Sequence, residues 1–211
     1  MRGLVRGLLW ILGILGAIAL LLHLFLFDVW KVPRGNDDRF ATSILPTLRA
    51  EELVLIHRGR VPKVGELARC KSPLDGGVYV VGRVFGAGGD RVEVQDRAVL
   101  TNGKQPAWRH ACPPVVVPHP VTHNLVTMSC SVAETDAASF EYFTPKEDGI
   151  SGGTSNALVE RGRLYLVSDN RLMHEDSRDV GQVDAATCEH IVFRLWGEKF
   201  SDATRRFAVL W

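Results

Sequence analysis

Three short segments carry the residues whose types and spacing could do chemistry. The first is Ala41-Thr42-Ser43-Ile44-Leu45-Pro46-Thr47-Leu48, the second is Val80-Val81-Gly82-Arg83-Val84-Phe85-Gly86, and the third runs from Ser168-Asp169-Asn170-Arg171 to Asp176-Ser177-Arg178. A serine hydroxyl such as that of Ser43 is a poor nucleophile at neutral pH unless a neighbouring base takes its proton. A Ser-x-x-Pro-Thr string alone describes many turns, so the prediction depends on all three segments in this order.

Taken together, these segments resemble the bacterial signal peptidase I family. In that family the first segment supplies a serine nucleophile, the second a lysine immediately before the arginine that acts as general base, and the third a loop that walls the site. The resemblance therefore implies that Ser43 is the nucleophile and that Gly82 occupies the position of the base. It also assigns the following residues to the wall of the site: Asp169, Asn170, Arg171 and Arg178.

The chain departs from the family pattern at several positions of this site. Gly82 replaces the base lysine, Ile44 replaces a methionine and Ser168 replaces a glycine. Ala41 stands where many members have a serine that donates to the oxyanion, and one such donor is typically worth ~10² to 10³ in rate. These departures predict catalysis that is impaired or lost.

One residue of the third segment offers a substitute base. His174 stands where many members have a serine, and a histidine near its ordinary pKa is a natural general base, with Asp176 as its possible orienter in a Ser-His-Asp arrangement. The alternatives are that His174 is an exposed loop residue, or that a lysine enters the site from elsewhere. The candidates for such a lysine are Lys63, Lys71 and Lys104.

An apolar segment precedes these residues. Residues 7–27 are apolar except for His23, and about 20 such residues span a bilayer as a helix. Asp28-Val29-Trp30-Lys31 follows in place of a cleavage site with small residues, which favours a retained anchor over a cleaved signal. We therefore expect an anchor over residues 1–30 and a linker over 31–40.

The rest of the chain predicts an all-β fold. Short β-type runs recur at Leu53–His57, 78–85, 91–100, 164–167 and 190–196. Prolines at 106, 113, 114, 118 and 120 and a Ser, Thr and Gly-rich stretch around residues 151–155 interrupt this pattern between residues 105 and 160. The resemblance implies a β core over residues 41–104 and 161–200, with a smaller β and loop insert over 105–160. Residues 201–211 form a tail that caps the sheet or touches the membrane.

Charge and cysteine content limit the partners. The chain has 25 basic and 24 acidic residues, a net charge of +1, and no concentrated basic face, so no nucleic-acid partner is expected. Cys112 and Cys130 are the first candidates for a disulfide, while Cys70 and Cys188 are buried thiols or a second bridge. The spacing of Cys112 and the histidines around it fits no standard zinc pattern, and no cofactor or metal is expected.

The resulting hypothesis is a single-pass protein of the bacterial inner membrane whose body lies on the extracytoplasmic side. By resemblance it would cleave signal peptides from exported preproteins, and its partners would be those signal peptides and the lipid bilayer. The alternatives are a non-catalytic paralogue that binds exported chains or a membrane partner, and an active protease rewired to Ser43 and His174.

Overall fold

Most elements of the chain are β-strands. The computed structural model describes residues 2–34, 42–119, 122, 124–146 and 153–210. In chain order its elements are α1 (Arg2–Phe25), β1 (Phe27–Lys31), β2 (Leu53–His57), β3 (Leu67–Lys71), β4 (Tyr79–Ala87), β5 (Arg91–Gln95), β6 (Ala98–Thr101), β7 (Ala107–Pro118), β8 (Leu125–Glu134), β9 (Ser139–Pro145), β10 (Thr154–Leu158), β11 (Arg163–Val167), α3 (Ser177–Val180), β12 (Val183–Asp184), η1 (Ala185–Thr187), β13 (Glu189–Trp196), η2 (Ala203–Arg205) and β14 (Ala208–Val209). The predicted all-β class is confirmed, with one long helix at the N-terminus.

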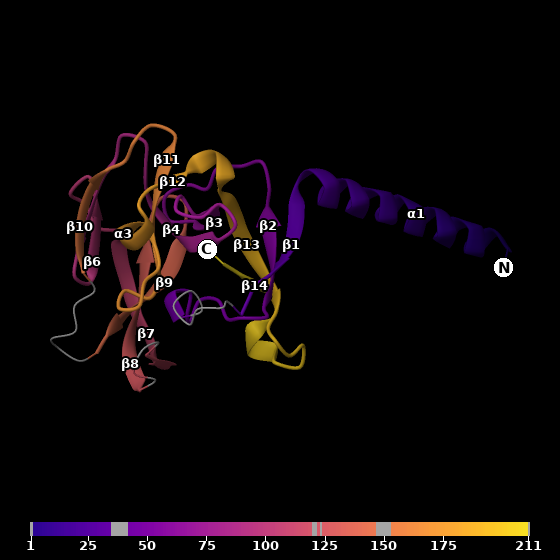
Figure 1. Cartoon of the computed structure of the whole chain (residues 1–211). Helices are drawn as coiled ribbons and strands as arrows, with labels where there is room; N and C mark the ends of the chain where they lie inside the picture. Colours follow the sequence, from indigo (N-terminus) through magenta and orange to yellow (C-terminus); the bar gives the residue numbers. More distant parts are fainter. Residues whose placement is uncertain (1, 35–41, 120–121, 123, 147–152, 211) are drawn as a thin grey trace.

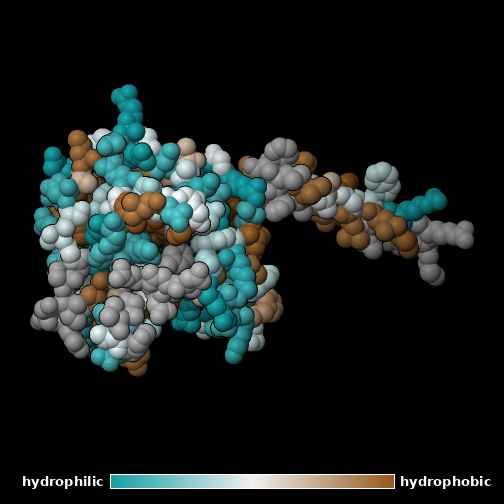
Figure 2. Space-filling view, in the orientation of Figure 1, coloured by the Kyte–Doolittle hydropathy of each residue, from teal (hydrophilic) through white to brown (hydrophobic). Residues whose placement is uncertain are grey.

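Helix α1 projects away from the β body and carries the N-terminus at its far end (Figure 1). Its window Val5–Leu22 has a mean hydropathy of 2.3 and none of it is buried, so it is long and apolar enough to cross a membrane. Apolar residues line its visible surface (Figure 2). The expected apolar helix was too long at its C-terminal end, because Phe27 already pairs with His57 of β2 as the first residue of β1.

The largest sheet is antiparallel and has eight strands, in the order β1-β2-β13-β3-β4-β11-β12, with β14 paired to β13. Strand β4 lies between β3 and β11, with Gly82 opposite Ala68 and Arg83 opposite Val167. Buried positions on both faces of β4 explain its long apolar run: Val81 joins one apolar cluster, whereas Val80 and Val84 join another.

Two three-stranded sheets complete the body, in the orders β10-β5-β6 and β7-β8-β9. The single strand expected over residues 91–100 is wrong: β5 and β6 form a hairpin that turns at Asp96, whose positive φ of 56° ends the first strand. Strand β10 lies within the predicted insert yet pairs with β5. The limits of the core and of the insert stay a prediction.

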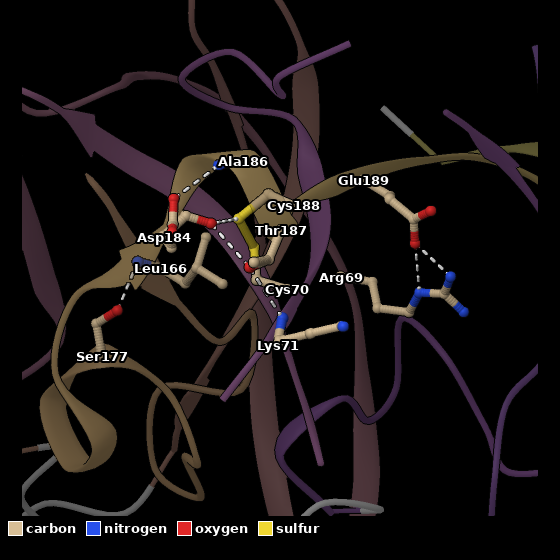
Figure 3. Close-up of a disulfide and its surroundings, with 10 residues drawn as sticks. All are labelled: Arg69, Cys70, Lys71, Leu166, Ser177, Asp184, Ala186, Thr187, Cys188 and Glu189. Atoms are coloured by element: carbon tan, nitrogen blue, oxygen red, sulfur yellow. Dashed lines mark hydrogen bonds and ion pairs between the residues drawn. A yellow bond between two sulfur atoms is a disulfide. The ribbon is translucent and has the colours of Figure 1, made fainter. Parts of the chain in front are cut away.

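Two disulfides connect elements of the body. Cys112 is joined to Cys130 across the β7–β8 hairpin. Cys70 of β3 is joined to Cys188, which directly follows η1, and Figure 3 shows this bridge beside the ion pair of Arg69 with Glu189. The second bridge ties the chain that follows η1 to β3, the strand beside β4. It therefore supports the part of the sheet on which the candidate site is built.

Candidate active site

Ser43 lies in a short turn that the structure describes from Thr42 onward. The N–H of Leu45 donates to the carbonyl of Thr42 at 3.1 Å, and the N–H of Leu48 donates to that of Ile44 at 2.8 Å. Ile44 and Leu48 are buried in the apolar cluster that contains Val81 of β4. The Ser43 side chain is fully buried. Ala41, the predicted position of a missing oxyanion donor, lies outside the described residues.

Asp169 joins all three predicted segments. Arg83 Nε and Nη2 donate to its two carboxylate oxygens at 2.9 and 3.0 Å, and Thr47 Oγ1 donates to Oδ2 at 2.8 Å. The side chains of Arg83 and Asp169 are 3% and 2% exposed. A buried bidentate pair of this kind is held by charge as well as geometry. Arg83 and Thr47 were not among the predicted site residues, although Arg83 directly follows Gly82 and Thr47 lies in the same segment as Ser43.

Asn170 holds the Ser43 turn against the third segment. Its Nδ2 donates to the carbonyl of Thr42 at 3.2 Å, while its Oδ1 accepts the N–H groups of Leu172 and Met173 at 3.2 and 3.0 Å. The same loop is tied to β9, because the N–H of Phe143 donates to Asp169 and its carbonyl accepts from Arg171, both at 2.8 Å. The predicted wall loop is thus packed between the Ser43 turn and the third sheet.

Arg171 is buried inside this loop. Its Nη1 donates to the carbonyl of Ser168 at 2.7 Å, and its guanidinium lies 4.9 and 5.4 Å from the ring centroids of Phe85 and Tyr142. Burial lowers the pKa of Arg171 to about 10, which leaves the side chain charged at neutral pH. Arg171 therefore stabilises the loop from its buried side.

Asp176 and His174 do not pair in the expected way. Arg178 Nε and Nη2 donate to Asp176 at 2.9 and 2.7 Å, and the N–H of Ser168 donates to it at 2.7 Å. Burial alone would raise the pKa of Asp176, but the hydrogen bonds and charge of Arg178 outweigh it and hold that pKa below its usual value. His174 Nδ1 instead lies 2.7 Å from Asp179 Oδ2.

Asp179 is thus the carboxylate that could orient His174, and it was not among the predicted site residues. Its Oδ2 also accepts the N–H of Asp176 at 3.1 Å as part of the cap of α3. A carboxylate at Nδ1 holds the proton there and leaves Nε2 as the acceptor. The helix cap is the signal that could have identified it, because Asp176 and Asp179 have the spacing of a capping box.

Gly82 has close neighbours on β11. A Cβ added to Gly82 would lie 3.2 Å from the backbone C and O of Val167 and 3.3 Å from Cβ of Leu166. These contacts are tighter than ordinary van der Waals distances, so a side chain here requires a small shift of β11. The predicted substitute lysines are all exposed side chains, unlike the buried Ser43; they are Lys63, Lys71 and Lys104.

The structure brings the three predicted segments together in one place. A buried serine turn follows an apolar helix, an arginine beside the base position is paired to the wall loop, and no lysine is present on β4. Cys112 is in a disulfide and offers no thiolate, so the zinc alternative loses its sulfur ligand. The chain thus combines a β body that joins the Ser43 turn to Arg83 and Asp169 with an N-terminal helix long and apolar enough to cross a membrane.

The chain belongs to the signal peptidase family, peptidase S26, whose family model matches residues 5–196. Over 195 residues it is 27% identical to a signal peptidase I of Bacillus licheniformis, and the similarity covers 87% of each chain. The predicted family is confirmed by these matches. Residues 197–211 lie beyond the family match.

Proposed function

We propose that this protein binds the signal peptides of exported preproteins beside the Ser43 turn and that its ability to cleave them is impaired or lost. Gly82 carries this proposal, because a serine without a neighbouring base is a poor nucleophile and the position of the base has no side chain. The joined segments around Asp169 support a retained site architecture, so loss of the base need not abolish peptide binding.

Binding would use an extended peptide that adds as a strand to a sheet edge. Such binding depends mainly on backbone hydrogen bonds, with shallow pockets for small side chains, and needs no general base. The proposed partners are therefore exported chains, with the bilayer holding α1. The proposed location is the bacterial inner membrane, single-pass, with the body on the extracytoplasmic side, where the two disulfides would be stable.

A second candidate is active cleavage by Ser43 with His174 as base. One observation favours it: Asp179 holds Nδ1 of His174 at 2.7 Å, which is how an orienting carboxylate prepares an imidazole to accept a proton at Nε2. In this version the orienter is Asp179 rather than Asp176, whose carboxylate is engaged by Arg178.

A cleavage assay on the purified full chain in detergent separates the two candidates. The substrate is a preprotein with an intact signal peptide, and the variants are Ser43→Ala, His174→Ala, Gly82→Lys and the control His110→Ala, which removes an exposed histidine of β7. Cleavage that disappears in Ser43→Ala and His174→Ala but persists in the control would establish the serine-histidine peptidase and contradict the loss of activity.

If the unmodified protein does not cleave the preprotein but can still be crosslinked to its signal peptide, the binding function is supported. Gly82→Lys tests the missing base directly, and cleavage in that variant would show that the peptide-binding site and Ser43 remain competent. The close contacts at Val167 predict a less stable variant, so folding is checked beside activity. A parent that neither cleaves nor crosslinks contradicts the proposal.

A further inference from the structure

The last residues of the chain dock onto the body next to the Ser43 turn. The N–H of Phe207 donates to the carbonyl of Leu195 at 3.0 Å, and the N–H of Leu210 donates to that of Val192 at 2.9 Å, so β14 follows the edge of β13. Leu210 is 8% exposed and belongs to the apolar cluster of Ile44. These residues lie beyond the family match, which ends at residue 196.

Arg205 reaches from η2 to the backbone of the Ser43 turn. Its Nη1 donates to the carbonyl of Pro46 and its Nη2 to that of Thr47, both at 3.3 Å. Arg194 of β13 also donates through Nη2 to the carbonyl of Thr47. Two guanidinium groups thus bind consecutive carbonyls that follow Ser43 by three and four residues.

Glu52 orients both guanidinium groups. It is fully buried, and its carboxylate accepts Nε of Arg205 at 2.7 Å, Nε of Arg194 at 3.1 Å and the N–H of Arg49 at 3.0 Å. A planar guanidinium that is fixed at Nε presents its remaining N–H groups in a rigid fork. A surface tail would not need this buried charge network, so the contacts indicate a role for the C-terminal residues at the turn.

We propose that Arg205 is a positioning residue for the Ser43 turn, oriented by Glu52 and held in place by the docking of Leu210. Arg205 and Leu210, which we call the C-terminal clasp, then belong to the working site although they lie at the other end of the chain. This inference rests on the proposed function in one respect, that the site is built around Ser43.

Thiol labelling of Ser43→Cys tests the clasp without any need for catalysis. All four native cysteines are in disulfides, so the introduced thiol is the single one in the full-length protein. In this background, Arg205→Ala should raise the rate of alkylation by iodoacetamide at least tenfold. The control Arg206→Ala removes a half-buried arginine that contacts Phe200 rather than the Ser43 turn, and it should leave the rate within twofold of the parent.

Rescue distinguishes positioning from general loosening. Pro46, Thr47 and Arg205 line an open cavity of about 380 Å³, which is large enough for a small cation. Millimolar guanidinium, far below denaturing concentrations, should slow the labelling of Arg205→Ala back toward the parent rate. It should not slow the labelling of Leu210→Ala, in which the side chain lost is apolar.

Several outcomes would contradict the proposed positioning role of Arg205. Unchanged labelling in Arg205→Ala, equal acceleration in Arg206→Ala, or acceleration that guanidinium does not reverse would each do so. If Arg205→Ala does not fold, Leu210→Ala decides: at least tenfold acceleration supports the clasp and an unchanged rate rejects it. Because labelling involves no signal peptide, a failure of the clasp is distinguishable from a failure of peptide binding.

Discussion

Replacing Asp169 by asparagine removes the charge that joins the three segments of the site while keeping the shape of the side chain. The guanidinium of Arg83, whose side chain is 3% exposed, then remains buried without a counter-charge. An asparagine NH₂ in the same place also presents a donor where Arg83 needs an acceptor. We therefore expect Asp169→Asn to be among the most destabilising single substitutions of the site.

The magnitude follows from the burial of this pair. Removing one partner of a buried ion pair costs about 3–5 kcal/mol, because it leaves an uncompensated buried charge. Thr47→Val deletes only the neutral hydrogen bond to Asp169 and should cost about 1 kcal/mol. Glu198→Gln removes a pair with Arg34 whose side chains are 63% and 71% exposed, so it should change stability by less than about 1 kcal/mol.

Urea unfolding of the detergent-solubilised chain, followed by the fluorescence of its five tryptophans, measures the loss of unfolding free energy in each of these three variants. The comparison is valid where the dependence of the free energy on urea has the same slope in all variants. A loss below about 1 kcal/mol in Asp169→Asn, or a loss no larger than that of Glu198→Gln, would refute the reasoning. It would mean that the buried pair does not hold the segments together.

Three further predictions concern the sheet around the site. Burial lowers the pKa of His190 to about 4, below the ordinary 6.5 of the unfolded chain. The free energy of unfolding is therefore unaffected by this group above pH 6.5 and falls by at most about 3 kcal/mol as the pH is lowered toward 4, because the unfolded chain binds the proton more readily. His190→Gln should reduce this pH dependence in urea unfolding. Replacing both Cys70 and Cys188 by serine should cost roughly 5 kcal/mol because the bridge closes a span of 118 residues, against roughly 3 kcal/mol for the bridge of the β7–β8 hairpin, which spans 18; thermal unfolding that ranks the two in the opposite order contradicts the chain-entropy argument. Gly82→Ala should lose about 1–3 kcal/mol because its Cβ meets the backbone of Val167 at 3.2 Å, and calorimetry that finds it as stable as the parent would show that β11 yields freely.

Much of the fold is readable from local patterns. The apolar run predicts α1, and alternating or buried apolar residues predict β2, β4, β11 and β13 within two residues of their observed ends. The hairpin of β5 and β6 was missed because its turn at Asp96 lacks a glycine. Strand β14 was missed because it is two residues long and exists only by pairing with β13.

Residue types and their order by themselves determined the family, the candidate nucleophile Ser43 and the absence of a side chain at Gly82. Only the tertiary structure decided which groups meet at the site: Arg83 with Asp169, Arg205 with the carbonyls after Ser43, and Asp179 with His174. Arg83 and Asp169 are 86 residues apart, and Arg205 is more than 150 residues from the turn that it contacts. Hydrogen bonds and ion pairs act over a few ångströms of space whatever the separation along the chain, so no local pattern encodes them, and the packing of the sheet selects the partners.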